Sequence, residues 1–252
     1  MTTTDQPRTN HTAAPEPPDR WRPDWSALAA EFTGTAFLLA AVVGSGIMAE
    51  TLTDDIGLQL LQNAFATAGV LTALILALGP ASGAHFNPAV TIADRIFGGI
   101  DTPTAATYIA AQITGAITGV ISANLMFDLA AVDWSTKDRS AGHLVFGEII
   151  ATVGLLLVIF GVVRSGRPSV AAFSVGGYIA GAYYFTSSTS FANPAVTIAR
   201  TLSDTFAGIE PASAPAFIAA QLAAVAIAAG LIRLIYPHIS DIADQVIVPH
   251  DN

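Results

Sequence analysis

Two asparagines, Asn87 and Asn193, each begin the same seven residues, Asn-Pro-Ala-Val-Thr-Ile-Ala. An Asn before Pro is typical of a helix start, because the Asn oxygen accepts from unpaired backbone N–H groups and Pro at the first helical position loses no hydrogen bond. The side-chain N–H groups can then donate to an oxygen of a small polar molecule. One copy would indicate only a helix cap. Two identical copies predict a pair of donor sites, formed by Asn87, Pro88, Ala89, Asn193, Pro194 and Ala195.

A second set of polar residues lies in or beside strongly apolar segments. The ionisable ones are candidates for function, because charge is costly inside a membrane. The glutamines are most simply hydrogen-bond partners between helices. These residues are Glu31, His85, Gln112, Glu148 and Gln221.

The composition indicates that lipid surrounds the elements carrying these residues. Of the 252 residues, 52% are hydrophobic and 12% are charged, with a mean hydropathy of +0.57. A soluble domain carries about 25% charged residues. The net charge of −9 comes mostly from acids in the tails and predicted loops, so the chain has no nucleic-acid footprint. Stretches long enough to cross a bilayer fall at 26–49, 58–79, 103–126, 143–163, 170–186 and 212–236.

The order of these elements predicts an inverted repeat. Each half contains a span with Glu, a second span, a short Asn-Pro-Ala segment and a span with Gln. The short segments, 80–98 and 187–207, are too polar at their starts to span, so each is expected to form a re-entrant loop and a half-helix. Three spans per half is an odd number, so the second half must be inserted upside down and the half-helices must meet near the midplane.

The predicted boundaries are a polar N-terminal tail over 1–25, a membrane domain over 26–236 and a C-terminal tail over 237–252. Within the domain, repeat one covers 26–126 and repeat two covers 143–236. The positive-inside rule places both termini in the cytoplasm. Seven cations then lie inside (Arg8, Arg20, Arg22, Arg95, Arg164, Arg167 and Arg233) and three outside (Lys137, Arg139 and Arg200).

The paired boxes resemble those of the major intrinsic protein family, the aquaporins and aquaglyceroporins, and the resemblance covers about residues 26–236. It implies an all-α membrane protein with six transmembrane helices and two re-entrant half-helices, usually assembled as a homotetramer with one pore per subunit. It further implies that Glu31 and Glu148 accept hydrogen bonds from the loops before the half-helices, and that His85 lies in the cytoplasmic half of the pore.

The chain departs from the family after the second box, where Val196 stands in place of the usual Arg. Counting from the boxes as in the family, the other constriction positions are Thr67, Gly181 and Ser190. All four residues are small or medium and none carries a charge, so a wide, uncharged filter is expected. Arg200 lies one turn beyond Val196; a position facing the outer headgroups or a loop is expected for it, and partial replacement of the missing charge is the alternative.

The resemblance predicts a passive channel in the cell membrane, the inner membrane if the source is bacterial, surrounded by lipid and conducting small neutral solutes. The expected permeants are glycerol, urea, arsenous acid or methylated arsenicals and, in addition, water. The arsenicals are expected because some bacterial family members with a similar second box, which also lacks Arg, are associated with arsenic resistance. Inverted repeats also build secondary transporters, which is the alternative. An enzyme is not expected, because the five His residues are scattered and no metal cluster, nucleophile constellation or nucleotide motif occurs. No cofactor is expected, and the absence of Cys excludes thiolate metal sites.

Overall fold

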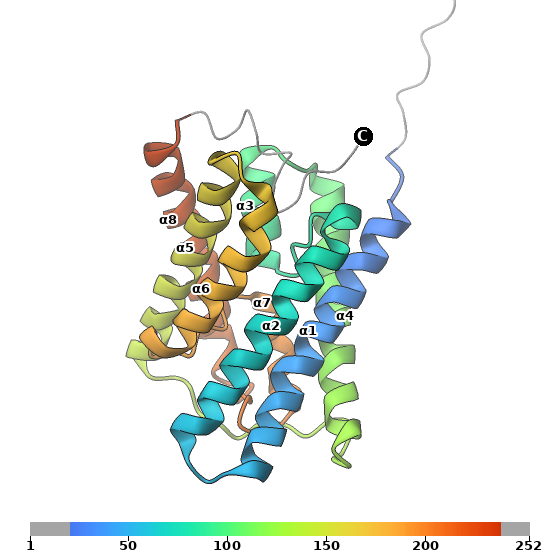
Figure 1. Ribbon diagram of the computed structural model, residues 1–252, viewed down its shortest axis with the longest axis vertical. Helices are drawn as coiled ribbons and strands as arrows, with labels where there is room; N and C mark the ends of the chain where they lie inside the picture. Colours follow the sequence, from blue (N-terminus) through green and yellow to red (C-terminus); the bar gives the residue numbers. More distant parts are fainter. Residues whose placement is uncertain (1–20, 238–252) are drawn as a thin grey trace, which may run out of the picture.

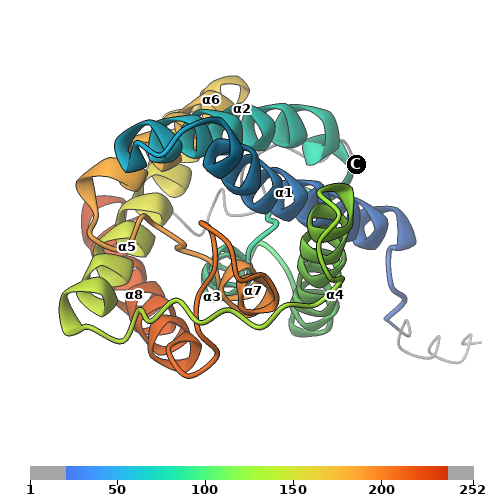
Figure 2. The same ribbon diagram turned by 90° about the horizontal axis from the view of Figure 1, so that it is seen from below.

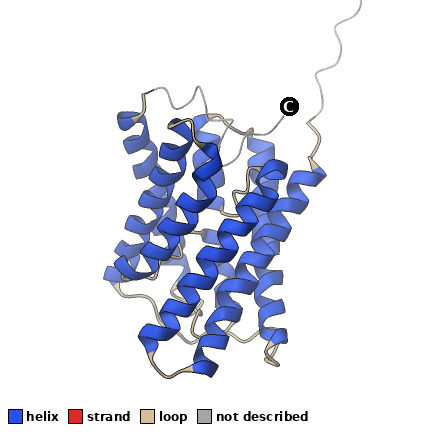
Figure 3. Cartoon of the chain, in the orientation of Figure 1, coloured by secondary structure: helices blue, strands red, loops and turns tan. Residues whose placement is uncertain are grey.

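Helices form all of the regular secondary structure in residues 21–237, the part of the chain that the computed structural model describes (Figure 3). The long helices are α1 (Trp25–Leu52), α2 (Ile56–Ser82), α4 (Thr102–Met126), α5 (Gly142–Arg164), α6 (Ala171–Phe185) and α8 (Ala214–Ile235). The short ones are α3 (Pro88–Phe97), α7 (Pro194–Ala199) and the 3-10 turns η1 (Pro168–Val170) and η2 (Arg200–Leu202).

The six long helices coincide with the six predicted spans to within three residues at each end. Five of them are long and apolar enough to cross a membrane by themselves. The sixth, α6, has only 15 residues, but the 3-10 turn η1 directly precedes it. At 1.5 Å per residue, α6 alone covers about 22 Å of a hydrocarbon core that is about 30 Å thick. The short fifth span was expected from the sequence.

The helices are arranged as two similar groups of four. In the first group α1 packs against α2 and α4, and in the second α5 packs against α6 and α8. Helices α2 and α6 join the two groups. Figure 2 shows the six long helices enclosing α3 and α7, which lie between α4 and α8. This is the arrangement expected for an inverted repeat with two half-helices inside.

The two ends of the molecule differ in what they expose. Helix α1 begins and α8 ends at the upper end in Figure 1, which we call the terminal face. The connections 53–55, 127–141 and 203–213 lie at the opposite end, which we call the loop face. Two of the cations counted for the orientation, Arg8 and Arg20, lie outside the described residues, as do 1–20 of the predicted N-terminal tail and 238–252 of the C-terminal tail.

Close contact between α1 and α4 depends on Gly115 and Gly119. A Cβ atom added at Gly115 would lie 2.3 Å from the backbone oxygen of Phe32, and one at Gly119 would lie 2.1 Å from that of Ala36. The four-residue spacing of small residues, a weak signal in so apolar a sequence, therefore marks a real backbone contact between helices.

Candidate functional site

The two repeated asparagines meet at the centre of the molecule, each at the start of a half-helix. The Asn87 oxygen accepts from the Ala89 N–H (2.8 Å), and the Asn193 oxygen accepts from the N–H groups of Ala195 (2.9 Å) and Val196 (3.3 Å). Pro88 and Pro194 occupy the first helical positions. Both caps therefore have the geometry expected from the sequence.

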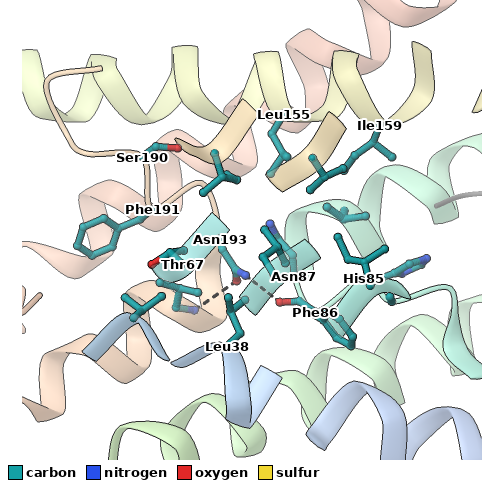
Figure 4. A pocket seen from close by; sticks show the side chains of 18 of the residues that line it. Leu38, Thr67, His85, Phe86, Asn87, Leu155, Ile159, Ser190, Phe191 and Asn193 are labelled. Atoms are coloured by element: carbon teal, nitrogen blue, oxygen red, sulfur yellow. Dashed lines mark hydrogen bonds between the residues drawn. The ribbon is translucent and has the colours of Figure 1, made fainter. Parts of the chain in front are cut away.

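Each asparagine also ties the two half-helices together, which was not anticipated. The Nδ2 of Asn87 donates to the Ala192 carbonyl at 2.8 Å. The Nδ2 of Asn193 donates to the Phe86 carbonyl, also at 2.8 Å (Figure 4). An amide nitrogen carries two hydrogens, so one N–H of each asparagine is engaged in this crossing and one is left for a solute.

Glu31 holds the loop that leads into α3. Its carboxylate is buried in α1 and accepts from the Ser82 hydroxyl (2.7 Å), from the N–H groups of His85 (2.9 Å) and Phe86 (2.8 Å), and from the Gln112 amide (2.7 Å). A buried carboxylate with four donors satisfies its own hydrogen-bonding capacity and that of the loop. The same Gln112 nitrogen also donates to Thr91.

Glu148 holds the loop that leads into α7 in the second repeat. Its carboxylate accepts from the N–H groups of Phe191 (2.9 Å) and Ala192 (2.8 Å) and from the Gln221 amide (2.6 Å), and that amide also donates to Thr197. In both repeats the glutamate therefore binds the loop that leads into the half-helix, and the glutamine binds the glutamate.

The loops held by these glutamates have an uncommon backbone. Ala84 and Phe86 before α3 have φ angles of 51° and 48°, and Ser190 and Ala192 before α7 have nearly the same, 52° and 47°. Positive φ is disfavoured for residues with a side chain. The carboxylate bonds to the neighbouring N–H groups hold this conformation in both repeats, and it turns carbonyl groups toward the Asn side chains.

A cavity of about 60 Å³ runs beside the paired asparagines. A water molecule needs on the order of 10–15 Å³ measured in this way, so the cavity has room for several. In Figure 4, Thr67, Ser190 and Phe191 lie toward one end of the cavity and His85 toward the other. Its other walls are apolar, formed mainly by Leu38, Val42, Leu71, Ile75, Val90, Leu155, Ile159, Val175 and Ile179.

Three of the four predicted constriction residues, Thr67, Ser190 and Val196, line this cavity, but the structure corrects the fourth. Gly181 lies on the exposed face of α6. Tyr183 lines the cavity instead, and its hydroxyl lies 3.1 Å from that of Thr67. The reason is helical geometry: Val175, Ile179 and Tyr183 recur every four residues along one face, whereas residue 181 lies on another face. The cavity wall therefore carries a larger side chain here than expected.

Arg200 is also placed differently from the expectation that it faces headgroups or a loop. It is only 3% exposed and lines the cavity together with Val196. Its guanidinium carbon lies 3.4 Å from the centre of the Phe191 ring, and its Nε donates to the Ala207 carbonyl. The cavity is therefore not uncharged: the guanidinium absent at position 196 is present one turn later.

The matching position of the first repeat carries the opposite charge. Asp94 follows the first heptapeptide as Arg200 follows the second, and it is 2% exposed. Its carboxylate lies 3.6 Å from the Nε2 of His85, whose Nδ1 lies 3.1 Å from the Thr91 hydroxyl. His85 lines the cavity, as the resemblance implied, whereas Asp94 does not.

Three residues near the cavity were missed or misplaced by sequence reasoning. Tyr183 could have been found from the four-residue spacing of the apolar face of α6. Arg200 could have been found from its equivalence to Asp94, since both follow identical heptapeptides. Arg139 comes from the long connection 127–141 and shows no periodic signal; its guanidinium lies 5.0 Å from the centre of the Phe191 ring.

Three cations, Lys137, Arg139 and Arg200, lie close together at the loop face, and the carboxylates of Glu50 and Asp204 lie near Lys137. The pKa of the Lys137 ammonium lies below its usual value, first because of burial and then because Arg139 and Arg200 repel a further positive charge. Burial likewise lowers the pKa of Arg139, while the Glu148 carboxylate opposes that shift. Arg139 nevertheless remains a cation, because a guanidinium starts from a very high pKa.

Comparison with known proteins agrees with this geometry. Residues 20–185 match the family described as Major intrinsic protein. The chain is 47% identical over 204 residues to aquaglyceroporin AqpS of Rhizobium meliloti (strain 1021), covering 81% of this chain and 87% of that relative. It is 33% identical over 172 residues to human aquaporin-2, covering 63% and 62% of the two chains. The X-ray structure of the aquaglyceroporin from Plasmodium falciparum superposes with a TM-score of 0.65 at 21% identity, covering 85% of this chain and 98% of that one.

Proposed function

This chain belongs to the major intrinsic protein family, and we propose that its solute path is the cavity beside Asn87 and Asn193. The protein is a membrane channel for small neutral solutes such as glycerol and water, and family members of this kind are channels and not enzymes. We further propose which residues form the filter along this path and which other neutral solutes pass it.

The observation that carries the proposal is the row of donors along an otherwise apolar wall. One N–H of each asparagine is free of the crossing bonds, and Thr67, Tyr183 and Ser190 add hydroxyls at one end. A solute with several hydroxyl or carbonyl oxygens can replace its water by these groups, while its carbon face contacts the apolar residues. An ion would lose far more hydration than these few dipoles return.

The filter in this proposal consists of Thr67, Tyr183, Ser190 and Val196, with Arg200 beside them. Glycerol and urea fit its donors and its small side chain at position 196. Arsenous acid presents hydroxyls much as glycerol does, so it belongs to the same chemical class of permeant. Methylated arsenicals add an apolar methyl group, which Val196 can contact.

Light-scattering uptake in proteoliposomes tests this path, with water, glycerol, urea and arsenous acid as separate solutes. Replacing Val196 by Arg puts a long charged side chain beside a cavity of only about 60 Å³. We expect glycerol uptake to fall by about tenfold or more, while part of the water flux remains, because each 1.4 kcal/mol added to a barrier is a factor of ten.

Val196→Leu is the matched control, because it adds volume without charge and should reduce glycerol uptake less. Unchanged glycerol uptake in the Val196→Arg protein would place the constriction elsewhere. Saturation at low solute concentration, or accumulation against a gradient, would favour the alternative of a secondary transporter.

The orientation and assembly are further parts of the proposal. Arg22 precedes α1, Arg164 and Arg167 lie at the connection from α5 to α6, and Arg233 is near the end of α8; Figure 1 shows these helix ends at the terminal face. Arg95 is next to Ile96, whose carbonyl accepts from Arg233. This placement supports a cytoplasmic position for that face in the bacterial inner membrane. The chain has no Cys. A single Cys introduced at Asp54 should therefore react with a membrane-impermeant maleimide from outside the cell, and chemical cross-linking should report a homotetramer.

A further inference from the structure

Two arginines converge on one phenyl ring at the loop face. The guanidinium carbons of Arg200 and Arg139 lie 3.4 Å and 5.0 Å from the centre of the Phe191 ring. Phe191 is 4% exposed, Arg200 3% and Arg139 9%. An aromatic face attracts a guanidinium, and the attraction strengthens when water is excluded. The ring therefore fixes the position of two charges that would otherwise extend into solvent.

Neighbouring carbonyl groups hold the two side chains from the other side. Arg200 donates through Nε to Ala207, and Arg139 donates through Nε to the next residue, Gly208, at 3.0 Å. Arg139 also donates through Nη1 to the Ser188 carbonyl at 3.4 Å. Both guanidinium groups thus depend on the same short stretch of the connection 203–213.

The two arginines differ in what their remaining donors face. Arg200 lines the cavity, whereas Arg139 stands behind it. Within residues 21–237, no hydrogen bond to protein engages the two terminal nitrogens of Arg200. A guanidinium has five N–H donors, so four of those of Arg200 remain for oxygen atoms in the cavity.

The charges around this point do not cancel. The nearby acid is Glu148, whose carboxylate is already engaged by the N–H groups of Phe191 and Ala192 and by Gln221. Two guanidinium groups and one carboxylate leave a net positive charge beside the cavity. At a few ångströms and in a medium less polar than water, such a charge repels a cation strongly.

We infer that Arg200, fixed on Phe191 and reinforced by Arg139, determines the specificity of this channel by excluding cations and by donating to neutral solutes. This inference rests on the proposed path through the cavity. It assigns to Arg200 the charge that Val196 lacks, from a position one helical turn nearer the loop face. Solutes with hydroxyl or carbonyl oxygens meet its terminal N–H groups before they reach the two asparagines.

The test compares Arg200→Gln and Arg200→Lys with the unchanged protein in the same proteoliposomes, by measuring K⁺ and methylammonium leak beside glycerol uptake. Gln keeps a donor for the Ala207 carbonyl but removes the charge, whereas Lys keeps the charge. We expect Arg200→Gln to raise cation leak by about tenfold or more, which is a conservative share of the expected repulsion. Arg200→Lys should retain most of the exclusion, so the ratio of cation leak to glycerol uptake should rise in Arg200→Gln and change little in Arg200→Lys.

The matched control is Arg233→Gln. Arg233 also stacks on a phenyl ring, that of Phe97 at 5.4 Å, but it is exposed on the terminal face and lies outside the cavity. Its replacement should leave cation leak at the level of the unchanged protein. An equal rise in leak in this control would mean that losing any stacked arginine loosens the protein, and it would overturn the inference.

Two further measurements test whether Arg200 itself excludes cations. A folded Arg200→Gln protein that still excludes K⁺ would show that Arg200 only supports the loop. If that variant does not fold, the reversal potential of the unchanged protein in a KCl gradient decides: residual conductance that favours Cl⁻ supports a positive filter, and conductance that favours K⁺ overturns it. Absence of glycerol uptake in the unchanged protein would instead contradict the proposed function.

Discussion

The half-helices α3 and α7 start in the same way and end differently. Both begin with Asn-Pro-Ala, and both follow a loop with three positive φ angles that is fixed by a buried glutamate. Seven residues after each asparagine, however, the first repeat carries Asp94 and the second carries Arg200. The residue nine positions before each of these also differs: Asp94 faces His85, whereas Arg200 stacks on Phe191.

The difference shows which parts of the duplication must stay alike. The glutamate, the asparagine and the glutamine each satisfy buried backbone or side-chain groups, so changing one leaves a donor or acceptor unpaired. The residues at 85 and 94 differ in type from their counterparts at 191 and 200, and their contacts differ as well. His85, with the Asp94 carboxylate 3.6 Å from its ring, lines one end of the cavity, and Phe191 and Arg200 line the other. The repeated scaffold therefore presents two chemically different ends.

Removing a scaffold glutamate should give the largest effect. Glu31→Ala leaves four buried donors without an acceptor and Glu148→Ala leaves three. Each such donor costs about 1–3 kcal/mol. We expect both proteins to lose most of their folded fraction, Glu31→Ala more completely, as measured by size-exclusion chromatography in detergent and by the thermal midpoint. A stable Glu31→Ala protein would contradict the view that the buried glutamates hold the loops of both repeats.

The helix contacts of the two repeats predict the next effect. Gly119 in α4 corresponds to Ala228 in α8, counting from Gln112 and Gln221. Because a Cβ at Gly119 would lie 2.1 Å from the Ala36 oxygen, Gly119→Ala should force α1 and α4 apart and cost about 1–3 kcal/mol of unfolding free energy. Ala228→Gly is the counterpart and should cost about 1 kcal/mol or less, through chain entropy. Denaturant titration in detergent measures both, and equal losses would contradict the difference in packing.

Asp94→Asn tests whether the charge of the first repeat matters in the same way as that of Arg200 in the second. Asp94 is buried and its carboxylate lies 3.6 Å from the Nε2 of His85, so replacing the carboxylate by an amide should lower the free energy of unfolding by about 1 kcal/mol or more. Cation leak should remain unchanged, because Asp94 does not line the cavity and Arg200 does. A leak as large as that expected for Arg200→Gln would mean that both ends of the cavity control ion exclusion.

The smallest effect concerns the starts of α4 and α8. Asp101 caps α4 by accepting from the Thr104 N–H at 2.8 Å, whereas Ser213 makes no side-chain cap on α8. Asp101→Ala should lower stability by about 1 kcal/mol or less. Ser213→Ala loses no cap bond, but it loses the bonds of the Ser213 hydroxyl to the Arg139 N–H and the Asp138 carboxylate. Hydrogen bonds from Thr104 lower the pKa of Asp101 below 3.8. The contribution of the cap is therefore complete above that value and is lost as the pH falls through the lowered pKa.

Thermal midpoints measured between pH 3 and pH 7 would check this last expectation. The difference between the unchanged protein and Asp101→Ala should shrink at the acid end of that range. A difference that grows on acidification would mean that the carboxyl is more stabilising when protonated, contrary to the hydrogen bonds observed.

Much of this protein follows from local patterns in its amino-acid sequence. Spans are recognisable because about 20 apolar residues are needed to cross lipid, and all six agree with the structure to within three residues at each end. The half-helix starts follow from Asn-Pro chemistry. The duplication predicts that Glu31 and Glu148 occupy equivalent positions, and that Gln112 and Gln221 do so as well, because residues in the same order have the same placement in the two halves of an inverted repeat.

The tertiary structure alone decided what occupies the loop-face end of the cavity. Tyr183 replaces Gly181 there because the rotation of α6 about its axis depends on its packing against α2 and α5, which a count from the boxes does not capture. Arg200 turns inward because the Phe191 ring and the Ala207 carbonyl offer it a better environment than lipid. The four-residue spacing of α6 and the equivalence to Asp94 could mark Tyr183 and Arg200 as candidates, but only the packed structure shows that both residues line the cavity.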